Sequence, residues 1–253
     1  MKKKLLLILF CSLVTTAAIA NEGGLPPKQM KWPFTGMTGK FDRQAIQRGF
    51  QVYKEVCSAC HSVHLVAYRD LKEVGFSDAE IKTIAAEYKV PDTDDSGEPI
   101  ERNALPSDHF VPPYPNEKAS RAANNGALPP DLSLMLKARH DGANYVYSLL
   151  TGFNEPVPTD IHVPDGQHYN PYFATKLIAM SPPLVPNIVK YMDGTEATID
   201  QMARDVVHFL EWTAEPELEK RKRMGLKVLI YLGIMTGLLY MAKLRIWARL
   251  NNE

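Results

Sequence analysis

The sequence predicts an all-α domain with irregular loop insertions, followed by one membrane-spanning helix near the C-terminus. Two segments with apolar residues at helical spacing predict the main helices, and a late apolar run with a single lysine predicts the membrane helix. Between the two helical segments the chain is rich in proline, glycine and acidic residues, which indicates loops. The 253 residues, 45% of them hydrophobic, suffice for one domain with attachments and exclude a disordered chain.

The first 20 residues, MKKKLLLILFCSLVTTAAIA, have the pattern of a secretory signal peptide. Three lysines precede an apolar run, and an A-x-A cleavage site follows at Ala18 and Ala20. The apolar run is shorter than the ~20 residues that a span needs, although an anchor that stays in place is the alternative. The lysines, without an Arg- and Ser-rich amphipathic pattern, favour bacterial export. We therefore expect the mature domain, residues 21–219, in the periplasm.

The first main helix is predicted within FDRQAIQRGFQVYKEVCSAC. Asp42 is a suitable N-cap, and Ile46, Phe50 and Tyr53 share one face. Gly49 is either the small residue that a close helix crossing requires or a tolerated helical glycine. This helix would lead the chain directly into a motif of two cysteines and a histidine.

The motif CSACH places these three residues at the end of that helix. Cys11 would leave with the signal peptide, so that Cys57 and Cys60 are the cysteines of the mature chain. A structural zinc site needs four Cys or His ligands, often as two cysteine pairs, and no second pair is present. A redox dithiol suits an exported protein but expects a βαβ setting and gives His61 no role. Covalent attachment of a c-type haem uses all three residues, and we favour it.

No local motif fixes the second axial ligand. Met180, in LIAMSPPLVP, is our candidate, because Pro182 and Pro183 stiffen the backbone that would hold a weak thioether ligand. A methionine opposite a histidine also raises the reduction potential, as suits an electron carrier. The alternative for Met180 is a core residue ahead of a proline turn. Met135 and Met202 have apolar neighbours at helical spacing and are expected in the core.

The closing helix is predicted within ATIDQMARDVVHFLEWTAEP. Thr198 and Gln201 form a capping-box pair at its start, and Pro216 ends it. The residues expected to point inward are Met202, Val206, Phe209 and Leu210.

An acidic segment lies between the two main helices. It carries five acids between Asp92 and Glu101, together with proline and glycine, and is predicted to be exposed and irregular. The chain shows no internal repeat, no phosphate-binding loop and no nucleophile paired with a base. We therefore propose no catalytic residue.

The C-terminal run MGLKVLIYLGIMTGLLYMA, residues 224–242, is close to the length that spans a bilayer, and a buried core helix is the alternative. Lysines and arginines flank both of its ends, so a positive-inside count does not fix the orientation. The signal peptide fixes the orientation instead, because it exports the domain that follows it, so that the tail after the membrane helix stays in the cytoplasm. We expect an inner-membrane anchor over residues 220–243, basic flank included, and a cytoplasmic tail over residues 244–253.

Five blocks of the sequence together closely resemble the cytochrome c1 family: RGFQVYKEVCSACHSVHLVAYRDL, RAANNGALPPDLSLMLKARHDGANYVYSLLTGF, YNPYFATKLIAMSPPL, DGTEATIDQMARDVVHFLEWTAEPE and RKRMGLKVLIYL. The resemblance extends over nearly all of the mature chain. The resemblance implies that Cys57 and Cys60 hold one haem c, with His61 as its proximal ligand and Met180 as its distal ligand. It also implies that Arg121 lies near a haem propionate, with a surface arginine as the alternative. Ser181 departs from the small apolar residue or proline usual in the family.

The resemblance implies an electron-transfer subunit of the cytochrome bc1 complex, ubiquinol:cytochrome c oxidoreductase. Such a subunit takes single electrons from the Rieske iron-sulfur protein beside cytochrome b, passes them to cytochrome c, and breaks no substrate bonds itself. The alternatives are the haem subunit of another membrane electron-transfer complex and a haem peroxidase, which needs an open iron position.

The charge of the mature domain agrees with a basic partner. Residues 21–219 contain 18 basic and 28 acidic residues, a formal charge of −10. An acidic surface speeds encounter with a basic protein such as cytochrome c at low salt and disfavours nucleic acid. The alternative is that the acid excess serves solubility alone.

Overall fold

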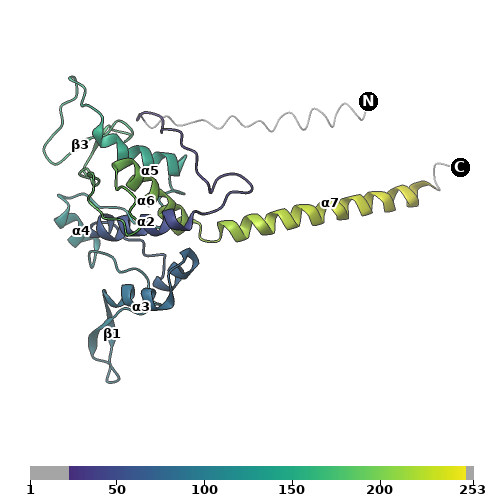
Figure 1. Cartoon of the computed structure of the whole chain (residues 1–253), viewed down its shortest axis with the longest axis horizontal. Helices are drawn as coiled ribbons and strands as arrows, with labels where there is room; N and C mark the ends of the chain where they lie inside the picture. The colour runs from purple at the N-terminus through teal and green to yellow at the C-terminus, as the bar shows by residue number, and fades with distance from the viewer. Residues whose placement is uncertain (1–22, 249–253) are drawn as a thin grey trace.

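The computed structural model describes residues 23–248, and the predicted signal peptide, with Cys11, lies outside them. A mainly helical domain occupies one end of the molecule, and the long helix α7 leaves it toward the other end (Figure 1). The helices are α2 (Arg43–Glu55), the short 3-10 helices η1 (Cys57–Ala59) and η2 (Tyr68–Val74), α3 (Asp78–Ala86), α4 (Glu117–Ala123), α5 (Gly142–Thr151), the 3-10 helix η3 (Gly152–Asn154), α6 (Ile199–Ala214) and α7 (Leu218–Ala248).

The prediction of an all-α domain is only partly right, because two small antiparallel hairpins accompany the helices. One pairs β1 (Lys89–Thr93) with β2 (Pro99–Asn103), and the other pairs β3 (His168–Tyr169) with β4 (Leu177–Ile178). The first hairpin projects from the domain beyond α3 (Figure 1).

The acidic segment forms this first hairpin and is exposed as predicted, but it is not irregular. Arg102 links the two strands and the following loop, with its Nε 2.5 Å from Asp92 Oδ2 and its Nη1 2.6 Å from Asp108 Oδ2. In the turn, Asp94 Oδ1 accepts hydrogen bonds from the backbone N–H groups of Ser96 and Glu98. Side-chain pairing across 6 and 10 residues therefore orders a segment whose composition alone indicates a loop.

The two predicted main helices are confirmed as α2 and α6. Asp42 caps α2 by accepting from Ala45 N at 3.1 Å, and Thr198 caps α6 by accepting from Gln201 N at 3.1 Å. The Gln201 side chain donates to Asp205 Oδ2 instead of accepting from Thr198 N, which donates to the Glu196 carbonyl, so only half of the predicted capping box forms. The apolar residues predicted to face inward are buried in both helices: Ile46, Phe50, Tyr53, Met202, Val206, Phe209 and Leu210.

α2 and α6 cross at Gly49, which agrees with the interpretation of Gly49 as the small residue that a close helix crossing requires. A Cβ at Gly49 would lie 1.9 Å from the Asp205 carbonyl oxygen and 2.9 Å from Phe209 Cβ. Beside this contact, Arg48 Nε donates to the buried Asp205 Oδ2 at 2.9 Å. The crossing therefore requires glycine, and an ion pair holds the two helices together next to it.

We expect Gly49→Ala to lower the free energy of unfolding by about 3 kcal/mol, because the added methyl group must push α6 away from α2. Thermal or urea unfolding of the full chain in detergent, followed by circular dichroism, measures the loss. Gly225→Ala in α7 is the matched control, since a Cβ there meets nothing within 4 Å. Equal stability of the two variants would contradict the crossing.

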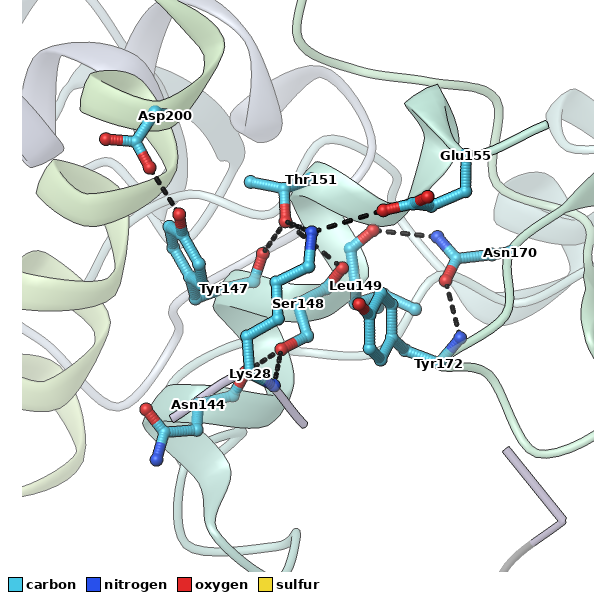
Figure 2. A network of polar contacts seen from close by, with 10 residues as sticks. All are labelled: Lys28, Asn144, Tyr147, Ser148, Leu149, Thr151, Glu155, Asn170, Tyr172 and Asp200. Atoms are coloured by element: carbon cyan, nitrogen blue, oxygen red, sulfur yellow. Dashed lines mark hydrogen bonds and ion pairs between the residues drawn. The ribbon is translucent and has the colours of Figure 1, made fainter. Parts of the chain in front are cut away.

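A polar network ties the N-terminal segment and the loop after β3 to α5 (Figure 2). Lys28 N donates to Ser148 Oγ at 2.8 Å, and Asn170 Nδ2 donates to the Leu149 carbonyl at 2.7 Å. Tyr147 on α5 donates a hydrogen bond to Asp200 on α6. α5 thus joins the chain before α2 to the two-helix core.

α7 is a 31-residue helix that is long and apolar enough to cross a membrane, and none of its most apolar window is buried in the domain. Its first residue, Leu218, is buried at the base of the domain. The helix includes the predicted anchor and continues to Ala248, so the predicted boundary at residue 243 is not a helix end. The lack of burial disfavours the core-helix alternative.

Candidate functional site

The CSACH motif forms one tight turn at the end of α2. The Cys57 carbonyl accepts from both Cys60 N, at 3.1 Å, and His61 N, at 2.9 Å. Tyr53, in the last turns of α2, donates its hydroxyl to the His61 carbonyl at 3.1 Å. The helix, the 3-10 turn and the Tyr53 hydrogen bond therefore hold both thiols and the imidazole close together.

The His61 ring is oriented by a backbone carbonyl. Its Nδ1 lies 2.7 Å from the Pro130 oxygen, and because a carbonyl only accepts, Nδ1 must carry the proton. Nε2 makes no hydrogen bond to any described residue and keeps its lone pair. Burial lowers the pKa of His61, with the hydrogen bond to Pro130 and the charge of Asp131 opposing. The result is a neutral imidazole with one free nitrogen, which is the metal-ligating form.

Asp131 fixes the chain after His61. Its carboxylate accepts from Ser62 Oγ at 2.6 Å, from His64 N at 2.9 Å and from Ser133 N at 2.9 Å. Burial by itself would raise the pKa of Asp131, but hydrogen bonds from Ser133, Ser62 and His64 outweigh it and lower the pKa to about 2. Pro130 and Asp131 therefore hold the chain at and just after His61 in place through hydrogen bonds.

Pro130 and Asp131 were not predicted from the sequence. Both lie in the block RAANNGALPPDL, but the Pro130 oxygen reaches His61 across 69 residues of chain. The only sequence signal was that this block belongs to the segments that resemble the family. Every residue has a backbone carbonyl, so the residue type at position 130 does not indicate a hydrogen bond to His61. Only the fold shows this contact.

Cys57 and Cys60 are free and half-buried. Burial, together with the nearby Cys60, raises the pKa of Cys57 to about 12. A redox dithiol needs a lowered thiol pKa, so this environment disfavours the dithiol alternative. No group of three or more His, Cys, Asp or Glu side chains within residues 23–248 is arranged to hold a metal ion by itself. Two thiols beside a free imidazole nitrogen fit a covalently attached haem.

Met180 lies in the loop that follows β4, two residues after the end of the strand, and it is half-buried. Met202 is fully buried in α6, while Met30 and Met135 pack against the core. Met37 and Met192 are 75% and 98% exposed. Among the methionines described before α7, Met180 alone is neither packed against the core nor largely exposed.

Arg121 lies in the last turn of α4, and its side chain is exposed. Its Nη1 donates to the Gly126 carbonyl at 3.1 Å, and its own carbonyl accepts from Gly126 N at 2.8 Å. These two hydrogen bonds close the turn between Arg121 and Gly126, which leads to Pro130 and Asp131.

A helical domain with a CxxCH turn and a free imidazole nitrogen, carried on a helix of membrane length, defines a membrane-anchored c-type cytochrome. The model of the Cytochrome C1 family matches residues 32–250, and the chain belongs to this family. Its members carry a covalently bound c-type haem and are the electron-transfer subunits of bc1 complexes, not catalysts by themselves. The alternatives of another complex or a peroxidase are not favoured.

The relatives include bacterial and mitochondrial proteins. Cytochrome c1 of Rhodospirillum rubrum is 46% identical over 247 residues, covering 91% of each chain. Cytochrome c1, heme protein, mitochondrial, of Schizosaccharomyces pombe is 47% identical over 239 residues, covering 94% of this chain and 78% of the relative. Cytochrome b/c1 of Bradyrhizobium diazoefficiens is 45% identical over 253 residues, covering 91% of this chain and 37% of the relative. With α7, this relationship makes the chain a membrane-anchored protein.

Proposed function

We propose that Cys57 and Cys60 hold one haem c through thioethers, that His61 Nε2 is the proximal ligand and that Met180 is the distal ligand. The observation that carries the proposal is the 2.7 Å contact between His61 Nδ1 and the Pro130 oxygen, which leaves Nε2 free beside the two thiols. When bound, the haem supplies one-electron redox chemistry. The hydrogen bond to the Pro130 carbonyl holds the imidazole in one tautomer.

The positions of the other methionines support Met180 as the distal ligand, because those methionines are either packed in the core or largely exposed. Met202 on α6 is fully buried in the core, and moving its sulfur outward would open a cavity. Met180 follows a short hairpin strand and precedes Pro182 and Pro183, which restrict the loop. A half-buried thioether on a stiff loop can be held at a metal without disturbing the core.

Arg121 is proposed to face a haem propionate. Its support is its place at the end of α4, where it closes the turn before residues 127–133. Those residues contact the motif and the chain just after it, since the Pro130 oxygen lies 2.7 Å from His61 Nδ1 and Leu132 N donates to the Ser62 carbonyl at 2.8 Å. An exposed guanidinium there could pair with a carboxylate at the edge of the site.

In the complex, we propose that the chain receives electrons from the Rieske iron-sulfur protein beside cytochrome b and passes them to cytochrome c. The name of the Bradyrhizobium relative, cytochrome b/c1, supports cytochrome b as a neighbour. Residues 21–219 are proposed as the periplasmic haem domain, residues 220–243 as the inner-membrane anchor, and residues 244–253 as a cytoplasmic tail. Residues 1–20 are proposed as the cleaved signal peptide.

Copurification tests these partners. A tagged chain, solubilised from the inner membrane with a mild detergent, should bring down a cytochrome b and a Rieske protein and should sustain quinol-to-cytochrome c turnover. Recovery with a different set of membrane proteins, or alone with its haem intact, would contradict the assignment.

The acidic hairpin β1–β2 is proposed as part of the surface that meets cytochrome c. Asp94 serves the turn and Asp92 pairs with Arg102, whereas Asp95, Glu98 and Glu101 are exposed and form no ion pair within residues 23–248. Those three carboxylates are free to attract a basic partner over a Debye length of roughly 8–10 Å.

Neutralising Asp95, Glu98 and Glu101 to Asn, Gln and Gln should slow electron transfer to a basic cytochrome c about fivefold at low ionic strength, with the difference shrinking as salt rises. Stopped-flow mixing measures the rate, and the haem spectrum should not change. The control neutralises the exposed Asp160, Asp165 and Glu196, which changes the net charge equally. A triple variant as fast as the parent at low salt would show that the hairpin faces away from the partner.

A further inference from the structure

The loop of residues 35–40, here called the membrane-side loop, is attached at both ends to the start of α7. On one side, Lys222 Nζ donates to the Phe34 carbonyl at 2.6 Å. On the other, Phe41 N donates to Glu219 Oε1 at 2.8 Å, and Arg43 Nη2 lies 3.0 Å from Glu219 Oε2. Lys222 stands two residues before Met224, where the apolar run of α7 begins. The loop is therefore fixed within about one helical turn of the lipid-facing part of α7.

The membrane-side loop is closed and firmly anchored. Lys40 N donates to the Pro33 carbonyl at 2.9 Å and closes the loop at its base. Trp32, Phe34 and Phe41, which flank it, are buried in the domain at 7%, 3% and 8% exposure. In Figure 1 the dark purple segment before α2 forms a loop that reaches past the start of α7, on the side from which that helix leaves.

The composition of the loop is unusual for a surface facing only water. Met37 is 75% exposed, between Gly36 and Gly39, and no described side chain covers it. The loop contains Lys40, Lys31 lies four residues before the loop starts, and residues 31–41 include no acidic residue. Both lysines are exposed and make no ion pair within the described part of the chain. An apolar tip flanked by cations, next to a membrane helix, has the chemistry that inserts into the interface of an anionic bilayer.

We propose that the membrane-side loop is a second membrane contact, in which Met37 enters the interfacial region and Lys31 and Lys40 meet anionic phospholipid head groups. A single helix leaves the domain free to tilt and rotate over the bilayer. A second contact, rigidly joined to Glu219 and Lys222, removes that freedom and fixes the height and orientation of the CSACH turn. The proposal rests on α7 crossing the bilayer.

Methionine oxidation in the full chain tests the proposal, with two other methionines as internal references. The chain is placed in lipid nanodiscs of phosphatidylcholine, with or without phosphatidylglycerol, and treated briefly with chloramine-T, a polar oxidant that stays in water. Mass spectrometry then gives the sulfoxide formed at Met37, Met192 and Met235. Met192, at 98% exposure, reports water access, and Met235, in the middle of α7, reports insertion of the helix.

In anionic nanodiscs Met37 should oxidise about fivefold more slowly than Met192, although both side chains are largely exposed in the protein alone. The Lys31→Gln and Lys40→Gln double variant should return Met37 toward the rate of Met192. The control Lys82→Gln and Lys118→Gln, at exposed lysines elsewhere, should not.

Three results would overturn the proposal. Met37 as reactive as Met192 while Met235 is protected would place the loop in water. Equal protection of Met37 in both lipids and in the double variant would show that Lys31 and Lys40 do not bind anionic head groups. Oxidation of Met235 at the rate of Met192 would show that α7 is not inserted, and the anchor would fail together with the proposal.

Discussion

Cys57→Ala and Cys60→Ala are expected to weaken or abolish covalent retention of haem, and the double variant should retain none. Each thiol can form one thioether, and no other cysteine occurs within residues 23–248. The haem stain of a denaturing gel, compared with the protein stain, measures the loss directly. Ser58→Ala is the matched control within the same turn, where Ser58 Oγ only donates to the Lys54 carbonyl at 2.7 Å. Full staining in both single variants would refute attachment at this motif.

Met180→Leu is expected to leave the haem attached but to lower its reduction potential by about 100 mV or more, within the ~0.8 V range that axial ligands command. Leucine keeps the volume of the side chain and removes the sulfur that would bind the iron. A redox titration followed optically measures the potential, and quinol-to-cytochrome c turnover should fall with it.

Met135→Leu and Met30→Leu are the controls for this substitution, because both methionines pack against the core and neither is proposed as a ligand. Their spectra and potentials should match the parent. An unchanged spectrum in Met180→Leu would place the distal ligand elsewhere. Met202 could take that place only by leaving the core, since it is fully buried in α6.

The elements that the sequence predicts best depend on residues close together in the chain. The caps at Asp42 and Thr198 and the apolar faces of α2 and α6 are local patterns, and both helices are confirmed. The place of Gly49 at their crossing was one of two interpretations, and the contact with Asp205 decides it. The apolar run predicts α7 in the same way, although the helix extends further at its C-terminal end.

The parts that could not be predicted depend on contacts that the fold alone creates, most of them across long stretches of chain. Arg102 orders the acidic hairpin by pairing with Asp92 and Asp108, and only the fold shows that these three side chains converge. The Pro130 carbonyl orients His61 through a backbone atom that any residue type would supply. The attachment of the membrane-side loop to Glu219 and Lys222 joins the two ends of the chain and has no sequence signature.

The ferric optical spectrum of the full chain tests most directly whether the protein is an electron carrier whose haem iron is bound by His61 and Met180. An electron carrier with His61 and Met180 on opposite sides of the iron should show a low-spin spectrum with the charge-transfer band of methionine-ligated ferric haem, and both should disappear in Met180→Leu. A high-spin ferric spectrum in the parent would mean an open iron position. That result would contradict the account, because an open position belongs to a haem enzyme and not to a subunit that relays electrons.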